Sequence, residues 1–115
     1  MSRADDAVRL RHMRDAAREA LEFAKNRRRE DLERDRMLSL AQVKYIEILG
    51  EAGSRISPAF QSEHPAIPWA EIIGMRNHLV HSYFDIDLDR LWATVTHDLP
   101  PLTLALERIL SNPRT

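Results

Sequence analysis

Apolar side chains recur every three or four residues along most of the chain, which is the period of an α-helix. The first such stripe predicts a helix from about Asp5 to about Arg28, and a second predicts a helix from about Asp35 to Ile56. The second stripe is the broader and more apolar of the two, which is typical of the central helix of a bundle. The stripes consist of Leu10, Met13, Ala17, Ala20, Leu21 and Ala24, and of Leu38, Ala41, Tyr45, Ile48, Leu49, Ala52 and Ile56.

Two glycines, Gly50 and Gly53, lie inside the second predicted helix. A glycine in a helix interior costs about 1 kcal/mol relative to alanine. The close approach of a neighbouring helix would explain both positions.

Prolines divide the second half of the chain. Ser57-Pro58 ends the second helix, because a residue before proline avoids the helical region, and residues 58–68 form a connection with at most one short helical turn. Pro68 then opens a helix from Trp69 to about Tyr83. Asp87 or Asp89 caps a further helix, and Asp98 before Pro100-Pro101 signals the start of another. These elements predict a single domain over residues 1–115, an all-α antiparallel bundle of four to five helices.

Composition narrows the possible functions. The chain of 115 residues carries 17 Lys and Arg against 18 Asp and Glu, a formal net charge of −1, which argues against a strongly basic nucleic-acid-coating protein. The absence of cysteine excludes disulfides, thiolate zinc sites and cysteine nucleophiles. No apolar run approaches the ~20 residues of a membrane span, and no secretory signal follows Met1. The sequence therefore predicts a cytoplasmic protein that does not enter a membrane.

One turn of the helix predicted over Trp69–Tyr83 gathers polar groups. Arg76 falls within the apolar stripe of that helix, and Asn77, His78 and His81 lie beside it. In one interpretation, Arg76 pairs with a buried carboxylate from another helix and the histidines are surface residues. In the other, the turn handles phosphate, since Arg binds phosphate in a bidentate way and His is the acid or base of neutral pH. Such a pair can cleave RNA without a metal ion, because the 2′-hydroxyl supplies the nucleophile.

Geometry limits how these side chains meet on a regular helix. Five residues separate Arg76 from His81 by about 140° around the axis, so the two point in different directions. They converge only if the helix unwinds near Leu79–Ser82 or if two copies face each other. On the same helix, Arg76 and Tyr83 would share a face, and Asn77 would share one with His81 and orient its imidazole.

Two further sets of polar residues are weaker candidates for a functional site. His78 and His81 are spaced for a metal ion, but with Asp85 as the only nearby third ligand no metal site is predicted. The arginines at 27–29 either contact RNA or form a solvated corner, and the acids around them favour the corner.

The segment from Ile67 to Phe84 resembles the signature of HepT-like toxins of the HEPN superfamily. Their RxxxxHxY motif is matched by Arg76, His81 and Tyr83. Ile46–Ala52 is similar to the second-helix pattern of that family, and Trp92 through Pro100-Pro101-Leu102 is similar to its closing helices. The resemblance thus covers nearly the whole chain.

The resemblance implies a helical homodimer with the motifs at the interface and RNA cleavage without a metal ion or other cofactor. Arg76 and His81 take the catalytic roles and Asn77 a supporting one. The RNA substrate is a tRNA or an mRNA. The family also implies a type VII-like HEPN/MNT toxin–antitoxin module, whose antitoxin is a minimal nucleotidyltransferase on a separate chain that adenylylates Tyr83 at the substrate rim. His78 and Ser82 depart from the more familiar residues of the motif, which bears on substrate preference.

Two other functions are compatible with these residues. One is a non-catalytic helical module that binds RNA, a nucleotide or a nucleotidyltransferase partner, and the other is a plain dimerisation module. The intact Arg–His–Tyr set favours the enzyme, whereas the near-neutral charge favours a binding module, because RNA affinity rests on basic contacts.

Overall fold

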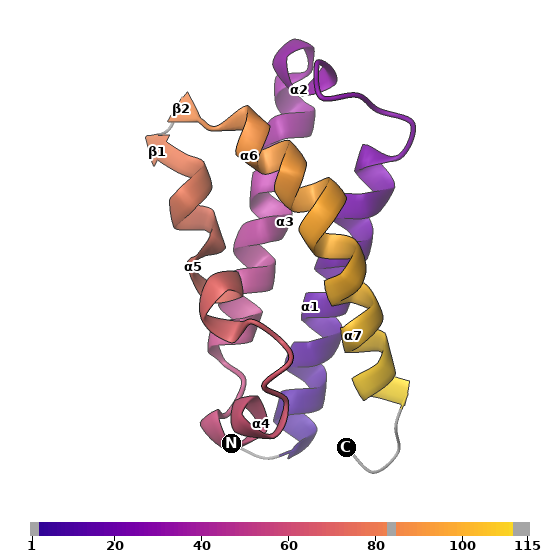
Figure 1. The fold of residues 1–115 in the computed structure, drawn as a ribbon, viewed down its shortest axis with the longest axis vertical. Helices are drawn as coiled ribbons and strands as arrows, with labels where there is room; N and C mark the ends of the chain where they lie inside the picture. The colour runs from indigo at the N-terminus through magenta and orange to yellow at the C-terminus, as the bar shows by residue number, and fades with distance from the viewer. Residues whose placement is uncertain (1–2, 83–84, 112–115) are drawn as a thin grey trace.

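The computed structural model describes residues 3–82 and 85–111, and it confirms the predicted antiparallel helical bundle. Four long helical segments alternate in direction along the chain, with short helices between them (Figure 1). The long segments are α1 (Arg3–Ala24), α3 (Arg36–Ser54), α5 (Trp69–Leu79) and the continuous run of α6 (Leu88–Ala93), the π-helical turn η1 (Thr94–Asp98) and α7 (Leu99–Ser111). The short elements are the helices α2 (Asp31–Arg34) and α4 (Pro58–Glu63) and the strands β1 (Val80–Ser82) and β2 (Asp85–Ile86).

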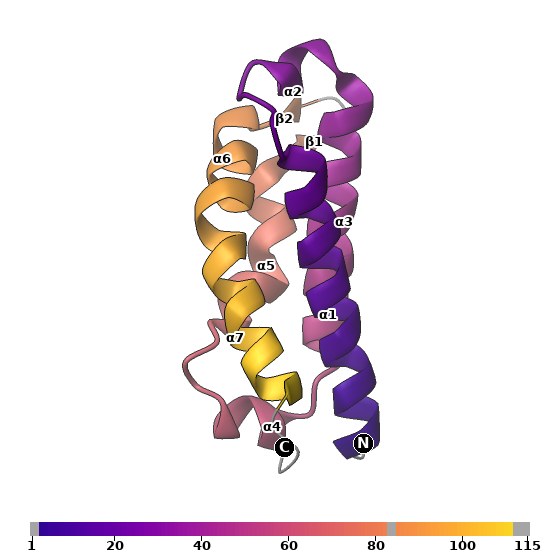
Figure 2. The ribbon, with the colours of Figure 1, turned by 90° about the vertical axis from the view of Figure 1, so that its right-hand side faces the viewer.

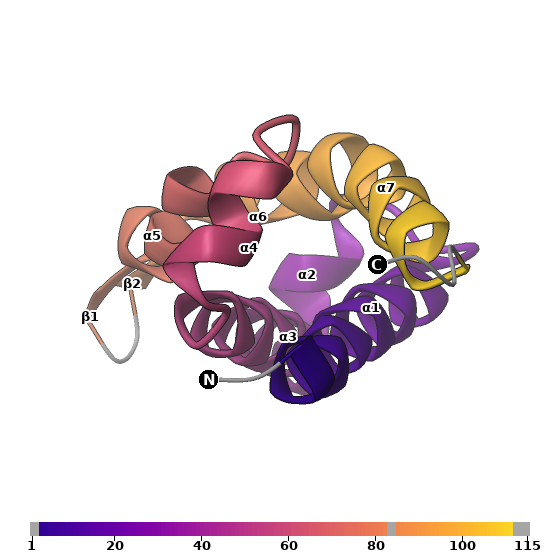
Figure 3. The same ribbon diagram turned by 90° about the horizontal axis from the view of Figure 1, so that it is seen from below.

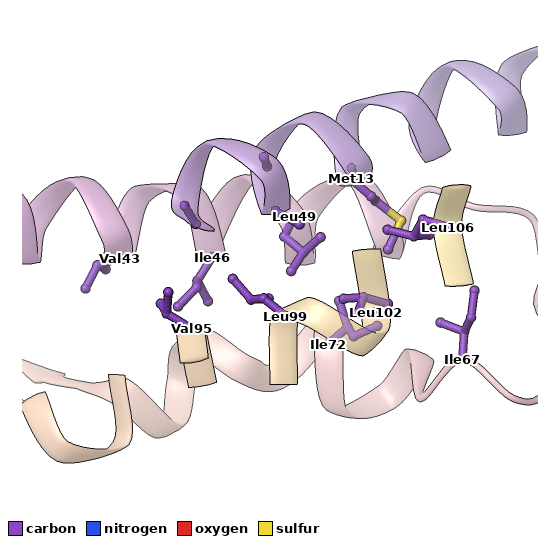
Figure 4. Packing of buried hydrophobic residues seen from close by; sticks show 14 of the residues in the cluster. Met13, Val43, Ile46, Leu49, Ile67, Ile72, Val95, Leu99, Leu102 and Leu106 are labelled. Carbon is purple, nitrogen blue, oxygen red and sulfur yellow. The ribbon is translucent and has the colours of Figure 1, made fainter. Parts of the chain in front are cut away.

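The bundle is an elongated body of 45 × 28 × 19 Å (Figure 2), and α3 lies between α1 and α5 (Figure 3). The hairpin and α2 lie at one end, and α4 lies at the other. Side chains from all four long segments meet in one apolar core (Figure 4). The largest fully buried apolar members are Met13, Ile46, Leu49, Ile56, Ile72, Leu79, Leu91, Val95, Leu99 and Leu106.

Helix α3 and helix α5 approach each other closely at Gly50. A β-carbon on Gly50 would lie 3.0 Å from the carbonyl oxygen of Ile72 and 3.3 Å from that of Ile73. At Gly53 the nearest atom to a β-carbon is the Met13 methyl group, at 3.4 Å. The close approach expected from the sequence therefore exists, and it is tightest at Gly50.

The predicted helix over Trp69–Tyr83 is too long, because α5 ends at Leu79. Val80 has extended backbone angles and pairs with Ile86 in a small antiparallel hairpin. The Asp87 N–H donates to the Leu79 carbonyl at 2.8 Å, which closes the base of the hairpin. The first helix is also shorter than expected, since it ends at Ala24 rather than Arg28, and Asn26 adopts a left-handed φ of 63° soon after.

The helix start predicted at Asp98 and the double proline is confirmed, because α7 begins at Leu99, but no loop separates α7 from the preceding helix. The chain passes without a break from α6 into α7 through the π-helical turn, in which the Leu99 N–H bonds to the Thr94 carbonyl five residues back. Pro100 and Pro101 carry no N–H, so the regular bonds they would make in an α-helix are missing. The wider turn accommodates this loss. The predicted cap at Asp87 is confirmed, because its carboxylate accepts from the Arg90 N–H at 3.0 Å.

The connection at 58–68 contains one short helix, α4, as the prolines predict. Asp6 is buried and accepts from the N–H and the hydroxyl of Ser57, at 2.8 and 2.7 Å, which ties the start of α1 to the start of α4. Within the described residues, no helix is both long enough and apolar enough to cross a membrane.

Candidate active site

Arg76 lies at the edge of α5 that faces α3, outside the core. The buried residues of α5 are Trp69, Ile72 and Leu79, whereas 46% of the Arg76 side chain is exposed. Its Nε donates to Oε2 of Glu47 on α3 at 3.2 Å. The Glu47 side chain is itself 40% exposed. The prediction of a guanidinium inside the buried stripe is therefore wrong. The predicted pairing of Arg76 with a carboxylate from another helix is confirmed, but that carboxylate is partly exposed rather than buried.

Arg76 and Asn77 open onto a groove between α3 and α5 of about 440 Å³. Both residues are exposed, as a substrate-binding role requires. Two carboxylates, Glu47 and Glu51, also line the groove. The remaining lining residues are Ile46, Gly50, Ser54, Arg55 and Ile73.

His81 lies on strand β1, one residue before the end of the described segment 3–82, and it is exposed. Side chains alternate along a strand, so His81 points to the face opposite the half-buried Val80. Because α5 ends at Leu79, His81 is no longer held about 140° from Arg76 around a helix axis. This is the unwinding near Leu79–Ser82 that the sequence analysis gave as one way for the two side chains to meet. The unwinding also removes the helix face that Asn77 would share with His81.

The four predicted site residues thus differ in how the structure places them. Arg76, Asn77 and His81 are exposed within six residues of α5 and β1, but among the described residues no hydrogen bond or ion pair joins Arg76 to His81. Tyr83 lies outside the described residues. The helix face predicted for Arg76 and Tyr83 does not exist, because Val80–Ser82 form a strand.

The structure also places His78 and the arginines at 27–29, which the sequence analysis named as weaker candidates. His78 is exposed on the last turn of α5, and the described residues contain no group of three or more His, Asp or Glu that is placed to hold a metal ion. Arg29 bonds to Glu33 and Asp89, at 2.7 and 2.6 Å, and these bonds raise its pKa, with Glu33 the larger cause. Arg27 lies 3.6 Å from Asp35. These pairs favour the solvated corner over an RNA contact.

The sequence analysis missed Glu47, the partner of Arg76. Glu47 falls inside the Ile46–Ala52 segment, but nothing in that segment alone indicates which residue of α5 it faces. The signal available was its neighbour Gly50, because a glycine demanded by the α3–α5 approach places the same stretch of α3 against α5.

The fold is a HEPN-type helical bundle that exposes an Arg and a His at the junction of α5 and β1. The family model described as Ribonuclease HepT-like matches residues 13–109. This chain belongs to the HepT-like ribonuclease family of the HEPN superfamily.

Relatives of several organisms carry related names. A Methanocaldococcus jannaschii protein named "Putative RNase" is 34% identical over 93% of this chain and 98% of its own length. A "Probable ribonuclease HepT" of Thermococcus cleftensis is 40% identical over 70% of this chain and 73% of its own length. A further M. jannaschii protein, named "Gamma-glutamylcyclotransferase and putative RNase", is 31% identical over 94% of this chain and 49% of its own length. No solved structure matches the chain.

Proposed function

We propose that this protein is an endoribonuclease that cleaves cellular RNA without a metal ion. The observation that carries the proposal is the early end of α5, which leaves Arg76 and His81 both exposed and free of a fixed helical relation. His81 takes the proton from the RNA 2′-hydroxyl as its oxygen attacks the adjacent phosphorus, and a proton returns to the leaving 5′-oxygen. Arg76 holds the charge that develops on the phosphorane. Asn77 supports the site from the α3–α5 groove.

The same proposal includes the biological setting implied by the family resemblance. The protein acts as the toxin of a type VII-like HEPN/MNT module, on a tRNA or an mRNA. A minimal nucleotidyltransferase, encoded on a separate chain, neutralises it by adenylylating Tyr83. Two copies of the toxin assemble so that the motifs face the interface. Exposed apolar side chains along α3 and on α5 support this assembly, namely Met37, Leu40, Ile48 and Ile73.

One observation favours the alternative of a non-catalytic module that binds RNA or a nucleotide and partners a nucleotidyltransferase. Arg76 is occupied by Glu47 in the single chain, and no bond joins it to His81. A protein of this kind would bind RNA and leave it intact, so a cleavage assay separates the two functions.

The test is incubation of the purified protein with total RNA, comparing wild type with Arg76→Ala and His81→Ala. Loss of a general acid or base typically lowers a rate by ~10²–10⁴-fold. Both residues are exposed, so we expect the variants to keep the wild-type melting temperature. His78→Ala is the matched control, since it removes an exposed histidine three residues from His81.

Incubation with EDTA distinguishes metal-free cleavage from cleavage that depends on a metal ion at His78 and His81. We expect cleavage to persist in EDTA and His78→Ala to cleave at the wild-type rate. Activity that disappears in EDTA, returns with zinc and is lost in His78→Ala would replace the metal-free mechanism with a His78–His81 metal site.

A further inference from the structure

A second hollow lies on the other side of α3, between α3 and α1. It has a volume of about 240 Å³. Two of its residues, Arg9 and His12, come from α1, and they are one helical turn apart. The α3 residues that line it are Ile48, Glu51, Ala52 and Arg55. The proposed ribonuclease mechanism uses none of these side chains.

Arg9 leaves a polar group unsatisfied in this hollow. Its Nε is buried, and no described residue hydrogen-bonds to it. Buried polar atoms in folded proteins almost always have a partner, and an unpaired one indicates a missing ligand or water. A guanidinium whose Nε lacks an acceptor is well suited to a phosphate oxygen.

The hollow adjoins the α3–α5 groove, and the two share lining residues. Glu51 and Arg55 line both, and Arg55 Nη2 bonds to Glu51 Oε1 at 3.0 Å on the ridge between them. This pair offsets the carboxylate of Glu51, and Arg9 is the other Arg side chain that lines the hollow. From Glu47, the partner of Arg76, to Arg55 is eight residues of α3, or about 12 Å along the axis. At ~3.4 Å per nucleotide of a stacked strand, this axial distance alone spans about three or four nucleotides, and the crossing of α3 adds to it.

We propose that Arg9 and His12, with Arg55 at the rim, form a phosphate-binding subsite for the RNA backbone. The subsite holds a phosphodiester at least about three nucleotides from the one at Arg76, and the strand crosses α3 between the two. This inference rests on the proposed function, because it takes RNA as the substrate. Phosphate contacts position a strand without reading its bases, so the subsite raises affinity for longer RNA of any sequence.

The test is the binding of 2′-O-methyl RNA oligonucleotides, which lack the free 2′-hydroxyl and are not cleaved. Arg9→Gln and His12→Glu are compared with Arg11→Gln, which makes the same charge change as Arg9→Gln but on an exposed position about 200° around α1. His12 is exposed, so His12→Glu keeps the test valid even if Arg9→Gln lowers stability. Affinities are measured for a trinucleotide and a decanucleotide over a series of salt concentrations.

We expect Arg9→Gln to weaken decanucleotide binding by about tenfold or more, since a bond to a charged group is lost. The slope of log affinity against log salt should fall by ~0.7, the value for one phosphate contact on a single strand. His12→Glu should weaken binding in the same direction, and the gain from trinucleotide to decanucleotide should shrink in both variants. Arg11→Gln should bind as wild type does.

Each result decides the proposal separately from the ribonuclease assignment. Equal losses in Arg9→Gln and Arg11→Gln, or losses independent of oligonucleotide length, would overturn the subsite, as would a wild-type protein that binds neither oligonucleotide. If total RNA is cleaved while Arg9→Gln and His12→Glu bind oligonucleotides as tightly as wild type, the subsite proposal is wrong and the ribonuclease proposal is supported. If oligonucleotide binding depends on Arg9 and His12 but total RNA is not cleaved, the subsite proposal is supported and the ribonuclease proposal is wrong.

Discussion

At the scale of single residues, the ion pair between Arg76 and Glu47 governs access to the proposed site. Both side chains are near half exposed, at 46% and 40%. Exposed pairs of this kind contribute about 0–1 kcal/mol to stability, so a phosphate can displace Glu47 from the guanidinium at little cost. In the proposed mechanism, Glu47 therefore competes with the substrate phosphate for Arg76.

Substitution of Glu47 tests whether its carboxylate competes with the RNA phosphate for Arg76. We expect Glu47→Gln to change the free energy of unfolding by less than about 1 kcal/mol and to lower the KM for RNA several-fold, because a negative charge leaves the phosphate groove. Denaturant titration and steady-state kinetics measure the two effects. Glu63→Gln makes the same charge change at an exposed position of α4 and is the matched control. A higher KM in Glu47→Gln would mean that Glu47 orients Arg76 for the substrate.

Tyr83 is the other residue with a separate prediction, and it rests on the family resemblance. Adenylylation adds a bulky nucleotide and negative charge next to β1, which repels RNA. Protein co-expressed with the cognate nucleotidyltransferase should gain mass in steps of one AMP group, mapped to Tyr83 by mass spectrometry. Tyr83→Phe should gain none and escape neutralisation. If the partner silences Tyr83→Phe equally well without added mass, neutralisation occurs by complex formation instead.

At the scale of elements, the long helices were predictable because their burial follows local periodicity. The bounds of α3 differ from the prediction by at most two residues at either end. The end of α5 was not predictable, because Val80 leaves the helix to pair with Ile86, a partner beyond the reach of helical periodicity. The continuity of α6 and α7 was missed for a similar reason, since a π-helical turn accommodates prolines that otherwise mark a boundary.

Gly50 and Gly74 allow a matched test of the α3–α5 contact. A β-carbon on Gly50 meets a carbonyl oxygen at 3.0 Å, whereas one on Gly74 of α5 meets nothing within 4 Å. Gly50→Ala should therefore separate the two helices and cost about 1–3 kcal/mol. Gly74→Ala should stabilise the protein by about 0.5–1 kcal/mol, the helical preference of alanine. Denaturant titration measures both, and equal changes at the two positions would contradict a steric role for Gly50.

At the scale of the whole molecule, the sequence indicated the candidate site residues but not their surroundings. Arg76, Asn77 and His81 were recognisable from the motif, and all three are exposed. The groove, Glu47 and the hollow beside Arg9 depend on how α1, α3 and α5 pack, which no local pattern encodes. The case for a dimer changes as well, because the divergence of Arg76 and His81 on one helix no longer requires a second copy.

The dimer is supported instead by the outward face of α3. Met37, Leu40 and Ile48 lie within about 80° of one another around that helix, and 82% of Met37 is exposed. We expect Met37→Glu with Leu40→Glu to convert a dimer to a folded monomer, because buried charges without partners oppose association. Sedimentation measures the mass and circular dichroism the helical content. A wild-type protein that sediments as a monomer while cleaving RNA at full rate would contradict the dimer.

Whether each active site draws on both copies is a separate question that mixing decides. We expect Arg76→Ala and His81→Ala chains, each inactive alone, to regain activity when they are unfolded together and refolded as a mixture. In a heterodimer with shared sites, one site receives both substitutions and the other receives neither. Random pairing makes about half of the dimers heterodimers, so about a quarter of the wild-type activity should return. If each site lies within one chain, every site in the mixture lacks Arg76 or His81 and no activity returns. Because the end of α5 at Leu79 frees His81 from the helix, that outcome would place Arg76 and His81 together within a single protomer.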